Sequence, residues 1–254
     1  MKMSLVAALV GLIACSAAWA EEEKPANEVT ANVSLVSDYR YRGISQTRLR
    51  PALQGGVDYV HNPSGLYAGT WLSTIQWIRD TPGAGGAAVE TDFYGGKRGE
   101  IPGGISYDVG LLAFVFINNG FEDAGMKNPN TLEAYAQLGW GPAYIKYNHA
   151  VTTLFGYPDS KNSGYLDIGA NVELSNKFIL NLHAGYQKVR GTTSAEASYG
   201  DFKVGVTKEF AALSGVSVSL AAITTNARRS FYVSPVQNKY LGKDTVVLSV
   251  TKTF

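Results

Sequence analysis

The amino-acid sequence predicts an all-β protein, a transmembrane antiparallel β-barrel of about 12 strands with short periplasmic turns and longer extracellular loops. Three observations predict this class. Runs of about ten residues alternate apolar and polar side chains with period 2. The links between runs alternate between short and long. After residue 20 there is no apolar run of about 18 residues, the length that indicates a membrane-spanning helix.

The first twenty residues have the features of a secretory signal peptide. Lys2 precedes an apolar run over 5–14, and Ala18-Trp19-Ala20 forms an A-x-A cleavage site. We therefore expect residues 1–20 to be removed. The alternative is a lipoprotein signal that ends at Cys15.

Cleavage defines the mature chain. We expect a short periplasmic segment at 21–28 and the barrel at 29–254. Cys15 is the single cysteine, so its removal excludes a disulfide framework and a cysteine metal site. The loss of Lys2 takes the formal net charge from +1 to 0. A neutral chain lacks the basic field expected of a nucleic-acid-binding protein.

The clearest strand pattern is "YLDIGANVEL" at 165–174, where apolar side chains take every second position. The next run, "FILNLHAGYQ" at 178–187, alternates in the same way after the short link "SNK". Because a helix would repeat at 3.6 residues, the two runs predict a β-hairpin.

The same unit recurs along the chain. The predicted strands cover 29–42, 51–61, 66–77, 88–97, 104–116, 131–140, 142–150, 163–174, 178–188, 198–210, 214–224 and 244–254. The longer connections are at 78–87, 117–130, 151–162, 189–197 and 225–243. Strands of about 9–11 residues suit a tilted crossing of a bilayer. The soluble alternative, a periplasmic β-sandwich, would have shorter strands and would not sort its loops by end.

Five sequence blocks carry a family resemblance. They are "SDYRYRGISQT" at 37–47, "PALQGGVDYVH" at 51–61, "SGLYAGTWLS" at 64–73, "ISYDVGLL" at 105–112 and "YGDFKVGVTKEF" at 199–210. In succession they resemble the TorF porin family of Gram-negative bacteria, over nearly the whole mature chain. The resemblance implies an outer-membrane β-barrel with a channel role, and it implies no catalytic or ligand-binding residues.

The first strand sets the expected facing of the "YRYR" stretch. Val29 and Val33 are expected to face lipid, and continuing by twos puts Tyr39 and Tyr41 on the same face. We therefore expect these two tyrosines, with the terminal Phe254, in the aromatic girdle at the membrane interface.

Charged side chains on the face of the strands opposite to the lipid-facing residues are expected to line the lumen, because a charge on the lipid face costs about 2–4 kcal/mol at the midplane. The candidates are Asp38, Arg40, Arg42, Asp58, Glu90, Asp92, Asp108, Glu133, Lys146, Asp167, Glu173, His183, Asp201 and Lys203. They form either a charge-paired network that braces a narrow barrel or a selective pore with a constriction at Arg40 and Arg42. Both faces of the third strand are apolar, so its facing stays open.

The predicted function is passive diffusion of ions or small polar solutes, since twelve strands lie between a filled barrel and an open porin. The alternatives are a structural or adhesive barrel without transport, acting through 117–130 and 225–243, and a lipid-modifying enzyme. The enzyme is disfavoured because no histidine pairs with a serine. His149 faces outward whereas Ser163 faces the lumen, and His183 is expected in a lumen network. No cofactor is expected.

The expected location is the bacterial outer membrane, after export to the periplasm. The expected partners are its lipid and lipopolysaccharide, whose phosphates would meet Arg48 and Arg50 in the first surface loop. The barrel-insertion machinery would recognise the final strand, which ends on Phe254.

Overall fold

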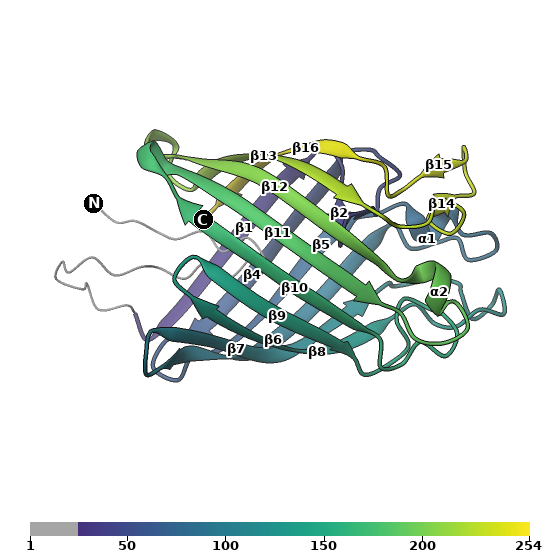
Figure 1. Cartoon of the computed structure of the whole chain (residues 1–254), viewed down its shortest axis with the longest axis horizontal. Coiled ribbons are helices and arrows are strands. Elements are labelled where there is room, and N and C mark those ends of the chain that lie inside the picture. Colours follow the sequence, from purple (N-terminus) through teal and green to yellow (C-terminus); the bar gives the residue numbers. More distant parts are fainter. Residues whose placement is uncertain (1–24) are drawn as a thin grey trace.

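Twelve long antiparallel strands close into one barrel in the computed structural model, which describes residues 25–254 (Figure 1). The strands are β1 (Asn27–Val36), β4 (Ala52–His61), β5 (Leu66–Thr74), β6 (Val89–Ile101), β7 (Ile105–Val115), β8 (Thr131–Trp140), β9 (Ala143–Ala150), β10 (Gly164–Glu173), β11 (Phe178–Lys188), β12 (Tyr199–Phe210), β13 (Val216–Thr225) and β16 (Thr245–Thr253). Each pairs with the next along the chain, and β1 pairs with β16 to close the barrel. The predicted signal peptide at 1–20 lies outside the described residues.

The predicted fold class is confirmed, and the strand boundaries differ by more than two residues at three places. β1 ends at Val36 rather than at residue 42, and β5 ends at Thr74 rather than at residue 77. β6 runs on to Ile101 rather than ending at residue 97, so the turn before β7 covers only 102–104. In each case the alternation of apolar and polar residues does not mark where pairing stops.

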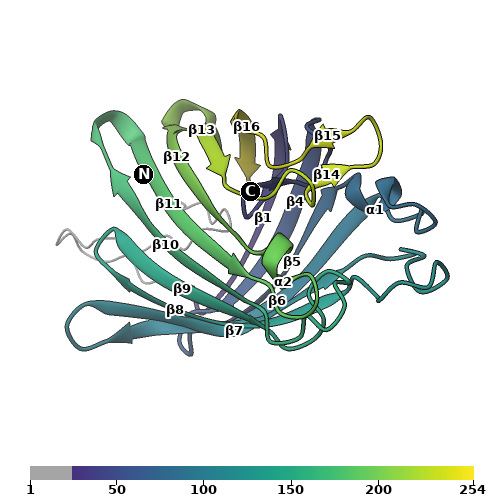
Figure 2. The same cartoon turned by 45° about the vertical axis from the view of Figure 1, so that its right-hand side comes forward.

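Shorter elements lie in the connections at both ends of the barrel. The long-loop end carries β2 (Arg40–Tyr41), β3 (Ile44–Ser45), α1 (Trp77–Asp80), α2 (Ser194–Ala197), β14 (Val233–Ser234) and β15 (Lys239–Tyr240). The short-turn end carries η1 (Ser175–Lys177) and η2 (Ala211–Leu213). Figure 1 shows α1, α2, β14 and β15 gathered at one end, opposite the C-terminus, and Figure 2 shows β14 and β15 beside α1. Among residues 25–254, no helix is long and apolar enough to cross a membrane.

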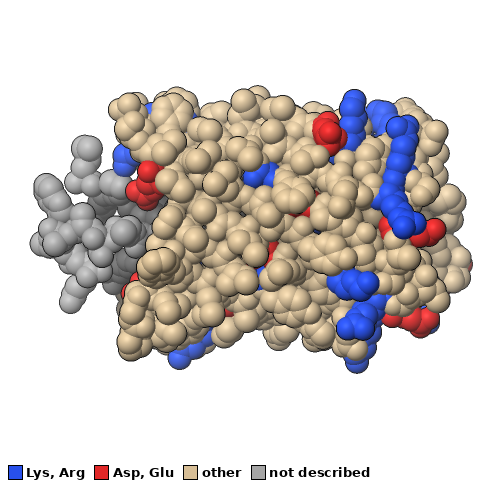
Figure 3. Space-filling view, in the orientation of Figure 1, with Lys and Arg blue, Asp and Glu red and all other residues tan. Residues whose placement is uncertain are grey.

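The outer face of the barrel is an apolar belt. Leu35, Val57, Leu111, Ile168 and Leu220, from five different strands, are each about half exposed. The middle of the surface in Figure 3 is almost free of charged side chains, which gather toward the two ends. Such a band flanked by charge is typical of a barrel that spans a membrane.

The exposure of side chains alternates along β5, which gives the facing of the third predicted strand. Leu66 and Leu72 are exposed on the outer face. Tyr67 and Trp71 point inward, where the Tyr67 hydroxyl donates to Asp108 Oδ1 (2.5 Å). The strand is apolar on both faces because aromatic rings line this part of the lumen.

Tyrosine rings cover glycines on the lumen wall. Gly69 of β5 pairs with Tyr94 of β6, and a Cβ at Gly69 would lie 2.5 Å from the ring of that tyrosine. Gly169 has the same relation to Tyr144. The absent side chain makes room for the ring on the neighbouring strand, which explains glycine in a strand interior.

Candidate functional site

The chain between β1 and β4 folds into the barrel mouth. We call residues 37–51 the inward segment. Its core is the hairpin of β2 and β3, in which Tyr41 pairs with Ile44 across a two-residue turn. The turn residues Arg42 and Gly43 have φ of 48° and 78°, the positive values of a type I′ turn. A Cβ at Gly43 would lie 2.8 Å from the Asp201 Cβ, so glycine lets the hairpin approach the wall.

The prediction that Tyr39 and Tyr41 join an interface girdle is wrong. Tyr39 is 7% exposed, and its hydroxyl donates to Glu90 Oε1 (2.7 Å) inside the barrel. Tyr41 packs edge-to-face against Phe114, with centroids 5.4 Å apart. The prediction fails because β1 ends at Val36, so the strand phase does not extend to these residues. Phe254 is exposed at the chain end, and its place in a girdle stays a prediction.

Arg42 spans the lumen and holds the inward segment to the far wall. Its Nη1 donates to Glu133 Oε1 (3.0 Å) and Gln187 Oε1 (2.6 Å), and its Nη2 donates to Glu133 Oε2 (2.7 Å). Tyr41 and Tyr165 flank the guanidinium, with ring centroids 4.7 and 4.2 Å from Cζ. The arginine therefore bridges β8 and β11 in a buried, bidentate ion pair.

Asp38 and Arg40 also belong to the inward segment and not to a wall strand, which corrects their predicted place. Arg40 Nε donates to Asp38 Oδ2 (2.5 Å), and its Nη1 donates to the carbonyl oxygens of Gly43 and Leu241. Ser45 Oγ donates to Asp38 Oδ1 (2.5 Å). These bonds fix the fold of the segment and join it to the last long loop.

Arg48 is held within the loops. Its Nε donates to Asp80 Oδ2 (2.6 Å), and Ser234 Oγ donates to the same oxygen (2.7 Å). The carboxylate of α1 therefore joins the inward segment to β14. Arg50, in contrast, is exposed.

A second charged cluster lies on the wall formed by β10, β11 and β12. His183 Nδ1 lies 2.8 Å from Asp167 Oδ1, and its Nε2 lies 2.7 Å from Asp201 Oδ2. The Tyr165 hydroxyl donates to Asp201 Oδ1 (2.9 Å). The expected histidine network is therefore present in the structure.

The remaining predicted lumen residues lie on wall strands. The Tyr94 hydroxyl donates to Asp58 Oδ1 (2.5 Å), and Lys146 Nζ lies 4.0 Å from the Tyr135 ring centroid. Wall positions hold Asp58, Glu90, Asp92, Asp108, Glu133, Lys146, Asp167, His183, Asp201 and Lys203, whereas Glu173 is exposed near the short-turn end. Most lumen carboxylates thus accept hydrogen bonds from tyrosine, arginine or histidine.

Beside the inward segment lies a cavity of about 180 Å³, which we call the aromatic cavity and which Arg42 and Ser45 of that segment help to line. Its lining includes the rings of Tyr41, Trp77, Phe114, Phe155, Tyr157 and Tyr232, together with Glu90. The rings come from the inward segment, α1, β7, the loop at 151–163 and the loop that precedes β14. Aromatic packing thus surrounds the mouth of the barrel.

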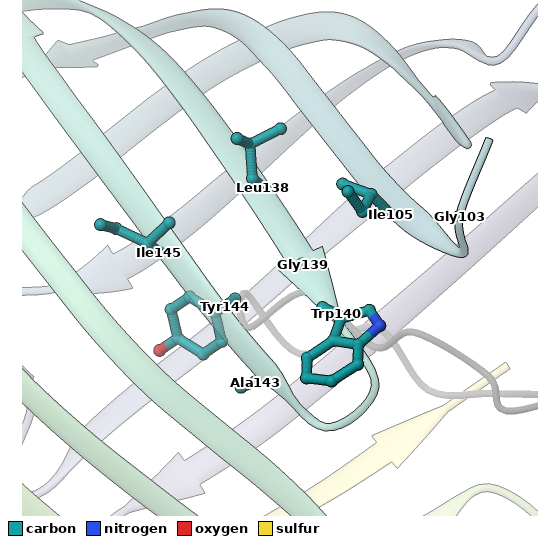
Figure 4. A pocket seen from close by; sticks show the side chains of 8 residues that line it. All are labelled: Gly103, Ile105, Leu138, Gly139, Trp140, Ala143, Tyr144 and Ile145. Atoms are coloured by element: carbon teal, nitrogen blue, oxygen red, sulfur yellow. The ribbon is translucent and has the colours of Figure 1, made fainter. Parts of the chain in front are cut away.

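A second hollow of about 450 Å³ lies at the short-turn end on β7, β8 and β9 (Figure 4). Leu138 and Trp140, which help to line it, are exposed on the outer face. Its lining is almost wholly apolar, so it belongs to the apolar belt. Within the described chain, no cluster of three or more His, Cys, Asp or Glu side chains could hold a metal ion.

Sequence reasoning missed several contacts. One is the pair His61 Nδ1 and Ser64 Oγ, 2.7 Å apart, although no histidine was expected to pair with a serine. Ser64 Oγ also accepts from the Leu66 amide, so the pair closes a short turn. Gln187 was missed as a partner of Arg42; its position on the lumen phase of β11 was the available signal.

Solved structures with a similar fold are barrels. A structure described as the KdgM porin matches with a TM-score of 0.53 and 6% identity, over 89% of this chain and 98% of that one. LpxR from Salmonella typhimurium (TM-score 0.41, 10% identity, 89% and 99% coverage) and a mutant of the Rh. blastica porin (0.39, 11%, 79% and 55%) are more distant. The first of these shows a shared fold, while the other two are too dissimilar to support an argument.

The sequence comparisons define the family. No curated protein matches the chain significantly. The model of a family described as "Bacterial protein of unknown function (Gcw_chp)" matches residues 20–254, which is nearly the whole chain. The protein therefore belongs to the Gcw_chp family.

Proposed function

We propose that the protein is an outer-membrane channel for passive diffusion of ions or small polar solutes, with the inward segment as the closure of its long-loop end. The observation that carries the proposal is a closed barrel with an apolar belt outside and charged side chains inside. A charged interior suits the passage of polar solutes. The porin-type fold supports the same function.

The closure restricts what passes. The inward segment crosses the mouth from Tyr39 beside Glu90 to Arg42 beside Glu133. Conduction therefore requires that the segment shift or that solutes pass around it, and the channel is narrow. Arg42 thus stabilises the closed state, and release of Arg42 from Glu133 opens the channel.

Conductance in planar bilayers tests this function. We expect wild-type protein to show small or rare conductance steps and Arg42→Ala to show larger or more frequent ones, because the anchor of the inward segment is lost. Arg50→Ala is the matched control, since Arg50 lies in the same segment but is exposed. Absence of channels in both wild type and Arg42→Ala would contradict a transport function.

The alternative is a structural or adhesive barrel without transport. The packed aromatic mouth favours it, because Trp77 contacts both Phe116 and Phe121 edge-to-face and the loops bury large side chains. The same bilayer experiment separates the two functions, since only the channel gives current when Arg42 is replaced.

We further propose that the barrel has no lipid-modifying activity. Ser163 is fully buried, and its Oγ donates to the carbonyl oxygen of Ser160, so it is not presented as a nucleophile. His149 Nε2 lies 3.2 Å from Asn162 Oδ1 and pairs with no serine. Hydrolysis of phospholipid or lipopolysaccharide by purified protein, lost in His149→Ala, would overturn this proposal.

The partners and the subfamily are proposals as well. We assign the chain to the TorF porins within its family, on the sequence blocks given above. Exposed Arg50, Arg228 and Arg229 at the long-loop end suit lipopolysaccharide phosphates. β16, which ends beside Phe254, suits recognition by the barrel-insertion machinery. Export through the proposed signal peptide at 1–20 would place the barrel in the outer membrane.

A further inference from the structure

The aromatic cavity is lined in part by Glu90, a buried carboxyl group that forms no ion pair with the described residues. Glu90 is 3% exposed and accepts a hydrogen bond at Oε1 from Tyr39, while no donor to its Oε2 is found among residues 25–254. Asp92, two residues along the same face of β6, is 4% exposed and its Oδ1 has no partner. Arg42 also lines the cavity, and its guanidinium is paired with Glu133 rather than with Glu90 or Asp92. The described residues therefore provide no ion pair for Glu90 or Asp92.

The rings beside this carboxylate form a cage. Tyr41, Phe114 and Phe155 meet edge-to-face in a mutual triad, with centroids 5.2 to 5.7 Å apart. Trp77 lines the same cavity, and its Nε1 has no hydrogen-bond partner within the described chain. Ring faces attract a cation through their quadrupole, most strongly where water is excluded. A cation bound among these rings would favour the ionised form of the Glu90 carboxyl, because an opposite charge offsets the loss of water.

We propose that the aromatic cavity binds a small organic cation, an ammonium with apolar substituents such as choline. Glu90 supplies the opposite charge and the rings of Tyr41, Trp77 and Phe155 surround the substituents. The volume of about 180 Å³ is smaller than the roughly 300–1,000 Å³ of sites for drug-sized ligands, so it selects a compact molecule.

Two other ligand classes fit the site less well. An inorganic divalent cation requires several oxygen ligands, and the described residues hold no such cluster. A neutral sugar would stack on the rings but would leave the charge of Glu90 unbalanced. The site does not depend on conduction, because its lining comes from the inward segment, the long loops and the adjoining wall, and is complete in the closed mouth.

Isothermal titration calorimetry on the full folded chain in detergent micelles tests the site. Choline chloride is titrated at constant ionic strength, beside 3,3-dimethylbutan-1-ol, its neutral analogue, and beside glucose. We expect saturable binding of choline, with weaker binding of both neutral molecules. Glu90→Gln should weaken choline binding about tenfold or more, since it removes the charge and keeps an acceptor for Tyr39.

Glu196→Gln is the matched control, because Glu196 is exposed on α2, and it should bind choline as wild type does. No saturable choline binding by wild type, equal affinity in Glu90→Gln, or tighter binding of glucose would each overturn the proposal. If Glu90→Gln does not fold, Phe155→Leu is measured instead. Unchanged choline affinity in Phe155→Leu would also overturn the proposal. Conductance of the wild type does not bear on this result.

Discussion

Arg42 is one residue on which the closed mouth depends. Replacing its partner, in Glu133→Gln, leaves a buried guanidinium without a carboxylate. We expect the free energy of unfolding to fall by about 3–5 kcal/mol, the cost of removing one member of a buried ion pair. Chemical denaturation of the protein folded in vesicles measures this change.

The control for that measurement is Glu100→Gln, since Glu100 is exposed at the short-turn end of β6. It should change stability by less than about 0.5 kcal/mol. Equal effects of the two substitutions would mean that the ion pair with Arg42 does not stabilise the fold.

The tyrosine-covered glycines give a second prediction at the scale of one residue. Gly69→Ala would place a Cβ against the Tyr94 ring, and we expect a loss of about 1–3 kcal/mol in the free energy of unfolding. Gly85→Ala is the control, because a Cβ there meets nothing within 4 Å. Heat-modifiable gel mobility over a temperature series compares them, and a lower transition for Gly85→Ala would refute the steric argument.

At the scale of elements, the long loops form a cap whose packing depends on neutral tyrosines. Burial raises the pKa of Tyr157, in the loop at 151–163, from 10.0 to about 12. A raised phenol pKa means that the folded cap favours the neutral ring. Its contribution is therefore complete below about pH 10 and is lost as the pH rises through about 12.

We expect the stability of wild type to fall over that pH range more steeply than that of Tyr157→Phe, which cannot ionise at this position. Unfolding free energies at a series of pH values, with the ultraviolet absorbance of tyrosinate, provide the measurement. Identical pH profiles in the two proteins would show that Tyr157 does not carry this dependence.

The long strands were accessible to sequence reasoning because each is long, alternating and bounded by polar links. β11 matches its predicted range of 178–188, and β8 matches 131–140. The inward segment was not accessible. "YRYR" continues the alternation of β1, and the chain reverses there through the positive φ of Arg42 and Gly43.

The contacts of the site were hidden for a different reason. Arg42 meets Glu133 and Gln187, which lie 91 and 145 residues further along the chain. The lumen phase of Glu133 was predictable from its strand, but which lumen residues face each other depends on the closure and stagger of the barrel. The alternation of residues within one strand does not show which residues on the opposite wall they will contact.

For the whole molecule, the apolar belt predicts where a charge is tolerated. Ile168→Arg places a charge in the middle of β10 on the outer face, where about 2–4 kcal/mol of folding free energy should be lost. Leu213→Arg makes the same kind of change in the η2 turn and should cost about 1 kcal/mol or less. Denaturation from lipid vesicles compares them, and equal costs would mean that the belt does not contact hydrocarbon.

The closure of the barrel has a consequence for the order of folding. Only Asn32 to Val36 of β1 pair with β16, five residue pairs, while every other junction between neighbouring wall strands has seven or more. This seam joins residues over 200 positions apart, so it forms late. Since Arg42 bonds to both β8 and β11, it needs the wall from β8 to β11 already assembled, so the mouth closes at the end of assembly and a newly inserted barrel passes through an open stage.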